Sequence, residues 1–171
     1  APAWISVLVL LAVASAQVVK DLYPTLASRI EAAGAVNSSA ALVAMFGRIY
    51  DPTSLGAIAM VKMTAFGGAG VAVIAGMITV RHSRTEEETG RLELLRGTVV
   101  GRRSSLTSAL MVAMLTSVTI GVVTALGLAA SGLPLDGSLA FGATWTGAGL
   151  AFAGVGAIAA QLARTARGAT G

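Results

Sequence analysis

The chain has 171 residues, of which 55% are hydrophobic and only 12% are charged, and its mean hydropathy is +0.80. Soluble domains carry about 25% charged residues, so this composition excludes an ordinary soluble domain and indicates an integral membrane protein. The net charge of +4 comes from clustered arginines without interleaved aromatic residues, which argues against a nucleic-acid-binding surface. The absence of Cys excludes disulfides and thiolate metal sites, and one His is too few for a histidine metal cluster.

The first apolar segment, residues 1–19, carries no charge and would span about 28 Å as a helix, close to the hydrocarbon thickness of about 30 Å. Trp4 stands near one end, and Lys20 and Tyr23 follow the other, as interfacial anchors do. A cleaved signal peptide is the alternative, because Ala14-Ser15-Ala16 resembles a small-residue cleavage site. The lack of a basic start and the presence of further spans favour a membrane span.

The mixed segment 20–54 predicts two short helices at the membrane surface. The first would begin at Thr25 and end at Gly34, and the second would be capped by Asn37 or Ser38. Apolar residues recur every three or four positions in the second helix, which gives it one apolar face. A substrate gate is the functional interpretation, and an amphipathic or re-entrant loop is the structural one. The recurring residues are Leu42, Met45, Phe46 and Ile49.

The second span is predicted at 55–80, with Asp51 as the N-cap of its helix and Pro52 at the first helical position. Its single charge, Lys62, can extend its ammonium group to the nearer interface, or it can mark a substrate path. A row of small residues at four-residue spacing predicts close approach of another helix. The row is Gly68, Ala72 and Gly76.

Two further spans are predicted at 104–131 and 138–163, joined by a turn at 132–137 that is rich in helix breakers. In the first of them, the hydroxyls of Ser117 and Thr124 are expected to bond backbone carbonyls or a neighbouring helix. The second carries a small-residue stripe for close packing and Trp145 as a candidate interfacial aromatic. The stripe is Gly142, Thr146, Gly149, Ala153, Gly156 and Ala160.

Arginine placement predicts the topology. If the charged stretch 81–103 is cytoplasmic, eight basic residues lie inside and three lie outside, as the positive-inside rule requires. The sequence therefore predicts an all-α, polytopic membrane helix bundle with four spans, an extracellular segment at 20–54 and a cytoplasmic loop at 81–103. The inner residues are Arg81, Arg84, Arg91, Arg96, Arg102, Arg103, Arg164 and Arg167, and the outer ones are Lys20, Arg29 and Arg48.

The loop 81–103 holds ten of the twenty charged residues and predicts a well-capped helix. Thr85 and Glu88 fit a capping box, and Gly97 suits the position just after the helix. Three glutamates in the first turn and Arg96 in the last complement the helix dipole.

The exposed face of this helix carries Glu86, Gly90 and Glu93, opposite Leu92 and Leu95. The bare Gly90 would let the backbone of a partner approach. Docking of a cytosolic partner is the functional interpretation, and a solvated connector is the structural one.

The sequence TEEETGRLELLRGTVVGR, residues 85–102, resembles the first cytoplasmic loop of ABC-2-type transporter permeases. That loop is Glu-rich, then continues with Gly-x-x-Glu-Leu-Leu and a small-residue stretch that ends in Arg. The branch described as exporters of polyketide antibiotics is also similar at Tyr23-Pro24, at Gly132-Leu133-Pro134 and along the tail 161–171. The resemblance covers nearly the whole chain; the loop motif is fairly specific, whereas the apolar spans are not.

The resemblance implies a multi-pass permease of the bacterial plasma membrane that exports hydrophobic, antibiotic-like compounds in multidrug efflux. In that family a separate ATPase holds the loop in a groove as a coupling helix. The chain would be a fragment of the first of two permease halves. Its partners would be the ABC ATP-binding subunit, the remaining half of the permease and the lipid bilayer. The coupling residues carried over to this sequence are Glu86, Glu87, Glu88, Gly90, Glu93 and Arg96.

No phosphate-binding Gly-x-x-x-x-Gly-Lys-Ser/Thr motif occurs, so ATP hydrolysis is expected in a separate chain and no enzymatic activity is expected in this one. His82 stands beside Arg81 in a basic loop, and no catalytic residue, metal site, cofactor or nucleic-acid partner is predicted. One alternative is a non-transporting membrane scaffold or assembly protein whose loop binds a partner. A membrane enzyme that uses carboxylates is disfavoured, because the acids cluster in the loop and not in the spans.

Overall fold

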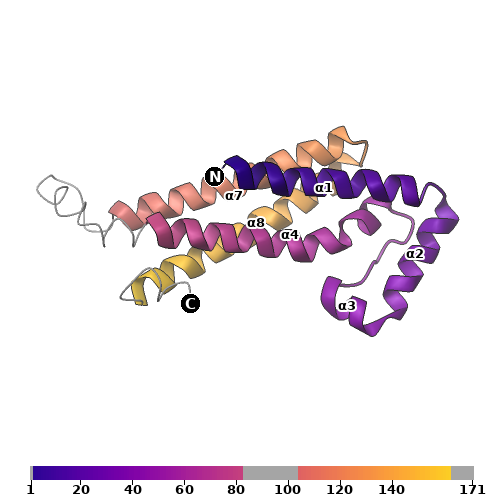
Figure 1. Cartoon of the computed structure of the whole chain (residues 1–171), viewed down its shortest axis with the longest axis horizontal. Coiled ribbons are helices and arrows are strands. Elements are labelled where there is room, and N and C mark those ends of the chain that lie inside the picture. Colours follow the sequence, from indigo (N-terminus) through magenta and orange to yellow (C-terminus); the bar gives the residue numbers. More distant parts are fainter. Residues whose placement is uncertain (1, 83–103, 163–171) are drawn as a thin grey trace, which may run out of the picture. The chain divides into compact units, whose positions relative to one another are not determined.

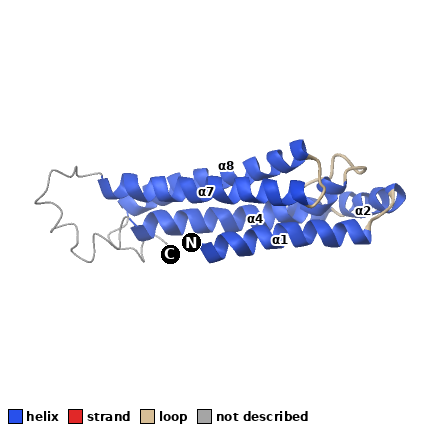
Figure 2. Ribbon diagram, turned by 90° about the horizontal axis from the view of Figure 1, so that it is seen from above, coloured by secondary structure: helices blue, strands red, loops and turns tan. Residues whose placement is uncertain are grey.

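The computed structural model describes residues 2–82 and 104–162. These residues form helices joined by loops, with no strand among them (Figure 2). The expected all-α fold class is therefore confirmed. The helices, labelled in Figure 1, are α1 (Pro2–Leu22), α2 (Leu26–Ser38), α3 (Ala40–Phe46), α4 (Leu55–Val80), α7 (Ser104–Ala130) and α8 (Leu135–Leu162).

Four helices in the described part of the chain, α1, α4, α7 and α8, are long and apolar enough to cross a membrane. A helix suits that environment because it satisfies its backbone polar groups internally. Helix α8 begins three residues before the predicted start at 138, since the Pro134 carbonyl already accepts a hydrogen bond from the Ser138 N–H at 3.0 Å. The four candidate spans are Ala3–Leu22, Leu55–Val80, Leu106–Ala130 and Leu135–Gln161.

The described residues fall into two compact units, each with its own core. Unit 1 lies within Ala1–Gly70 and Ile120–Trp145, and unit 2 lies within Val71–Thr119 and Thr146–Gly171. The predicted coupling helix at 85–97 and the basic tail at 163–171 lie outside the described residues.

In unit 1, the two short helices predicted within residues 20–54 exist, but their bounds differ from the prediction. Thr25, the predicted start of the first helix, is the N-cap of α2, because its hydroxyl accepts a hydrogen bond from the Ser28 N–H at 3.2 Å. The helix does not end at Gly34 but continues to Ser38. Ser39, in an extended conformation, ends α2 and caps α3 through the Leu42 N–H, so neither Asn37 nor Ser38 is the cap.

Asn37 instead joins α2 to the chain that follows α3. Its amide Nδ2 donates to the Ile49 carbonyl at 2.8 Å, and its Oδ1 accepts from the Ile49 N–H at 2.9 Å. Ile49 is buried with Ala33 and Ile58, so this clamp holds the returning chain in the core of unit 1. Gly47, with a φ of 87°, ends α3 and allows the chain to turn back.

The start of α4 corrects the prediction of Asp51 as its N-cap. Ser54 is the residue whose hydroxyl accepts from the first turn, through the Ala57 N–H at 3.2 Å. Asp51 lies further upstream, where its carboxylate accepts from the N–H and the hydroxyl of Thr53 at 2.9 and 2.6 Å. The Asp-Pro-Thr sequence therefore forms a turn before the helix, because the aspartate bonds locally to a residue two positions on.

Trp145 is completely buried in unit 1 and is not the interfacial aromatic that its position suggested. Its indole Nε1 donates to the Met63 carbonyl of α4 at 3.2 Å, and its ring contacts Phe141 with centroids 4.9 Å apart. The ring fills the space that Gly67 leaves, since a Cβ at that glycine would lie 2.7 Å from Cε2 of the indole. This fit joins α8 to α4 within the unit.

Helix α1 packs in unit 1 through a narrow strip of small residues. Ala12 and Ala16 are buried, whereas most of the large side chains of α1 are exposed. The hydroxyl of Ser15 donates to the Ala59 carbonyl of α4 at 3.3 Å. Val13 lies against Gly127 of α7, where a Cβ would come within 2.9 Å.

Unit 2 consists of the end of α4, the first part of α7 and the end of α8. Its core is the buried trio Ala75, Ala113 and Ala153, with Ile78 and Leu110 packed beside it. Small residues at the centre leave room for the three helices to approach closely.

Hydroxyl groups in the spans are mostly satisfied within their own helices. Ser117 is buried and donates to the Ala113 carbonyl at 2.8 Å, and Thr79 donates to the Ala75 carbonyl at 3.0 Å. Thr124 departs from this pattern, because its buried Oγ1 has no hydrogen-bond partner in the described part of the chain. The expected carbonyl bond therefore forms at Ser117 and not at Thr124.

The adjacent glycines 67 and 68 provide a matched test of the indole fit. Gly67→Ala should lower the stability of the purified protein in detergent by about 1–3 kcal/mol, the usual cost of overpacking. Gly68→Ala, whose Cβ would meet nothing within 4 Å, should keep or raise stability, because Ala favours a helix over Gly by about 1 kcal/mol. Unfolding in a denaturing detergent measures both. Trp145→Leu combined with Gly67→Ala should recover part of the stability that Gly67→Ala alone removes, because the smaller side chain makes room for the added methyl group. Stability losses that simply add in the double variant would contradict the fit.

A second matched pair lies in α8 of unit 2. A Cβ at Gly149 would lie 2.6 Å from the Ser117 Cβ and 3.0 Å from a Val71 methyl group, whereas one at Gly147 would meet nothing within 4 Å. We expect Gly149→Ala to lower the midpoint of thermal unfolding and Gly147→Ala to leave it unchanged or higher. Equal midpoints for the two variants would show that α8 does not depend on this close approach.

Candidate functional site

The predicted ATPase-coupling residues lie outside the described residues, so their role stays a prediction. They are Glu86, Glu87, Glu88, Gly90, Glu93 and Arg96. The exposed Arg81 and His82 are the last residues described before this loop. Among residues 2–82 and 104–162, no three His, Asp or Glu side chains gather as metal ligands would.

The six residues predicted to support helix packing are divided between the two units. In unit 1, a Cβ at Gly142 would lie 3.0 Å from the Ala125 Cβ, whereas one at Gly68 would meet nothing within 4 Å. In unit 2, a Cβ at Gly156 would lie 3.0 Å from the Gly76 carbonyl oxygen. The remaining two residues also belong to unit 2. A Cβ at Gly149 would lie 2.6 Å from the Ser117 Cβ, and Ala72 is 4% exposed.

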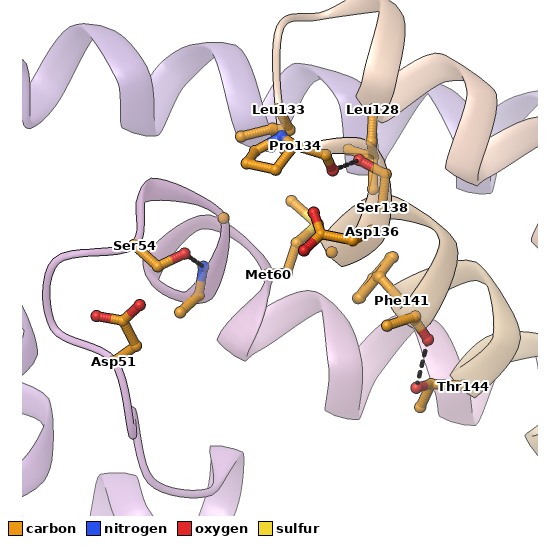
Figure 3. A pocket seen from close by; sticks show the side chains of 14 residues that line it. Asp51, Ser54, Met60, Leu128, Leu133, Pro134, Asp136, Ser138, Phe141 and Thr144 are labelled. Carbon is orange, nitrogen blue, oxygen red and sulfur yellow. Dashed lines mark hydrogen bonds between the residues drawn. The ribbon is translucent and has the colours of Figure 1, made fainter.

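A hollow of about 520 Å³ lies in unit 1, beside the start of α4 and the turn between α7 and α8. Figure 3 shows it with side chains from both α4 and α8 projecting into the same space. Its inner wall is apolar: Met60, Leu128, Leu133 and Phe141 line it, and each is at most 9% exposed. A cavity of this size and lining falls within the range of small-molecule sites in proteins.

Two carboxylates, Asp51 and Asp136, line the same hollow (Figure 3). The hydroxyl and the backbone N–H of Thr53 hold the Asp51 carboxylate and lower its pKa below the ordinary value of an aspartate. Asp136 stands in the first turn of α8, where its charge complements the positive end of the helix dipole. No hydrogen bond or ion pair joins its carboxylate to another residue that the structure describes.

The hydroxyl groups of Ser138 and Thr144 at the hollow already donate hydrogen bonds to nearby backbone carbonyls. Ser138 donates to the Pro134 carbonyl at 2.8 Å, and Thr144 donates to the Ala140 carbonyl at 3.0 Å. Their oxygens can still accept hydrogen bonds, but their protons are occupied. The side chains at the hollow therefore present mainly acceptors and negative charge to whatever enters it.

Lys62, the charge within the second span, has an aromatic neighbour in unit 1. Its ammonium nitrogen lies 6.0 Å from the centroid of the Phe46 ring, at the outer limit of a cation–π contact. Phe46 of α3 also meets Phe66 of α4 edge to face, with centroids 5.5 Å apart. The surface helix α3 thus lies beside the charged position of α4.

The hollow is the part of the site that the sequence did not predict. Asp51 was expected to be a helix cap and Asp136 part of a turn, and nothing in their spacing of 85 positions indicates proximity. Asp51 directly precedes Pro52, and Asp136 directly precedes Gly137. Their shared position beside helix breakers, on the predicted outer side of the membrane, is the sequence feature that could have indicated the site.

No family model matches the chain. The chain is 40% identical over 167 residues to the multidrug efflux system permease protein Rv1217c of Mycobacterium tuberculosis (strain ATCC 25618 / H37Rv). The alignment covers 97% of this chain and 30% of that protein, so the chain spans less than a third of the length of its relative. This relative confirms the resemblance to multidrug efflux permeases. Together with four helices of membrane length, it identifies the chain as a multi-pass bacterial cell-membrane protein homologous to part of a multidrug efflux permease.

Proposed function

We propose that this chain forms part of the membrane-embedded permease of an ATP-driven exporter that moves hydrophobic, antibiotic-like compounds out of the cell. The observation that carries the proposal is the 40% identity to an efflux permease over 97% of the chain. The membrane-length helices support it, because a permease must surround a path through the bilayer. The chain itself would not be an enzyme, and ATP hydrolysis would occur in a separate ATP-binding subunit.

The charged segment 81–103 is the part of the chain best suited to contact that subunit, because it holds ten of the twenty charged residues. Its glutamates, Glu86–Glu88 and Glu93, would meet basic or polar groups of the ATPase, and Gly90 would allow close backbone contact. Nucleotide binding would bring two ATPase subunits together and shift the population of permease conformations. Helices that meet through glycines and alanines can then move as packed bodies between two arrangements.

The coupling role is tested by reversing the three adjacent charges, Glu86–Glu88, to Lys in the complete transporter. Attraction to the ATPase would become repulsion, so we expect the ATPase to be lost on co-purification and efflux of a fluorescent drug to fall to background. Glu31→Lys on the predicted outer side is the control and should change neither. Efflux that continues unchanged without the bound ATPase would contradict coupling. A wild-type protein that binds the ATPase normally but transports none of the tested drugs would favour the alternative of a non-transporting membrane scaffold.

Lys62 tests whether the charge in the second span belongs to a substrate path. The span would hold the stem in lipid while the ammonium reaches the interface beside Phe46, so the charge should be dispensable for transport. We expect Lys62→Met to keep efflux within about twofold of the wild type, since an exposed cation–π contact contributes only about 0.5–1 kcal/mol. Lys62→Arg is the charge-retaining control. Loss of efflux in Lys62→Met alone, at normal expression, would place the lysine on the substrate path.

A further inference from the structure

We propose that the hollow between the start of α4 and the α7–α8 turn binds lipophilic organic cations. Binding of these cations does not depend on the proposed export function. Only a role of the hollow as a binding site for compounds during export rests on the proposed function. All of the lining belongs to unit 1.

The first argument is the shape and polarity of the wall. Met60 and Phe141, which are 7% and 8% exposed, present apolar atoms to the hollow, and the fully buried Leu128 also lines it. The volume of about 520 Å³ accommodates a compound with several rings. Such a surface attracts an apolar body through the area that it removes from water.

The second argument is charge. Both formally charged residues that line the hollow are aspartates, and none of its described lining residues is Lys, Arg or His. Two basic residues stand close to the hollow without lining it: the ammonium of Lys20 lies 3.5 Å from the Cβ position of Gly132, and Arg48 lines a neighbouring hollow that shares Asp51. The full negative charge of Asp136 outweighs the partial charge of about +0.5 at the start of α8.

The third argument concerns the state of the two carboxylates. Asp51 is held in place and in its charged form by Thr53, so it offers a fixed negative charge at the edge of the hollow. Asp136 is exposed and has no hydrogen-bond or ion-pair partner in the described structure, and it lines the hollow together with the apolar Met60 (Figure 3). An apolar wall next to an unpaired carboxylate recognises a compound that combines a hydrophobic body with a positive charge.

The test uses two probes of nearly the same size and shape but opposite charge, tetraphenylphosphonium and tetraphenylborate. Equilibrium dialysis against the purified full-length protein in detergent, with empty micelles subtracted, measures saturable binding. We expect saturable binding of the cation and none of the anion. Asp136→Asn should weaken binding of the cation about two- to fivefold, the range of an exposed ion pair, and Asp51→Asn in addition should weaken it further. Equal binding of the two probes, or an unchanged cation affinity in the double variant, would overturn the proposal.

Two further variants separate the site from general effects on the protein. Asp21→Asn removes an aspartate of unit 1 that does not line the hollow and should leave cation binding unchanged. Ala140→Phe places a ring in the hollow and should abolish saturable binding, while a normal melting temperature shows that the protein is folded. Saturable cation binding that survives Ala140→Phe would overturn the site.

The same measurements distinguish this proposal from the proposed function. Cation binding that depends on Asp136, in a protein that exports nothing, would contradict the export function and support the site. Export of a lipophilic cation that is unchanged in the double aspartate variant would contradict the role of the hollow in export and support the export function.

Discussion

The contact between the Trp145 indole and the bare backbone at Gly67 is the constraint on which unit 1 depends most. Two helices in an apolar environment gain little from burying hydrophobic surface, because lipid is as apolar as a side chain. They associate through close fit and through polar bonds that lipid cannot replace. The indole provides both, since its ring fills the notch and its N–H bonds the Met63 carbonyl. Unit 2 meets the same requirement differently, because its described core is built around three alanines, Ala75, Ala113 and Ala153.

Much of the fold could be predicted because membrane spans are encoded by composition. The long apolar runs predicted four spans, and the described part of the chain has four helices of membrane length. The errors lie at helix ends, where several nearby polar residues compete for the same N–H groups. Asp51 and Ser54 could each cap α4, and Asp51 bonds Thr53 instead because its side chain reaches a residue two positions on. Gly34 did not end α2, because glycine permits an end and does not require one.

The candidate site was less predictable, because it depends on long-range contacts. A stripe of glycines shows that a helix can pack closely but not which glycine faces a partner; Gly67 receives the indole while Gly68 next to it meets nothing. The hollow with Asp51 and Asp136 brings together residues far apart in the chain, and neither residue belongs to a motif. The predicted coupling helix, in contrast, rests on a local motif, which is why sequence alone could suggest it.

The clamp between Asn37 and Ile49 has a consequence for the way the outer segment of unit 1 can vary. The side chain of Asn37 closes a backbone loop that contains α3. Ile49, at the other end of this loop, is buried in the core with Ala33 and Ile58. The entropy of closing such a loop rises only slowly with its length. A change in the length of α3 between Asn37 and Ile49 therefore alters the closure entropy only slightly, and the contact of α3 with α4 that it would disturb is the one between Phe46 and Phe66. The clamp fixes where the chain returns to the core, and the Phe46 ring fixes where the helix inside the loop meets α4.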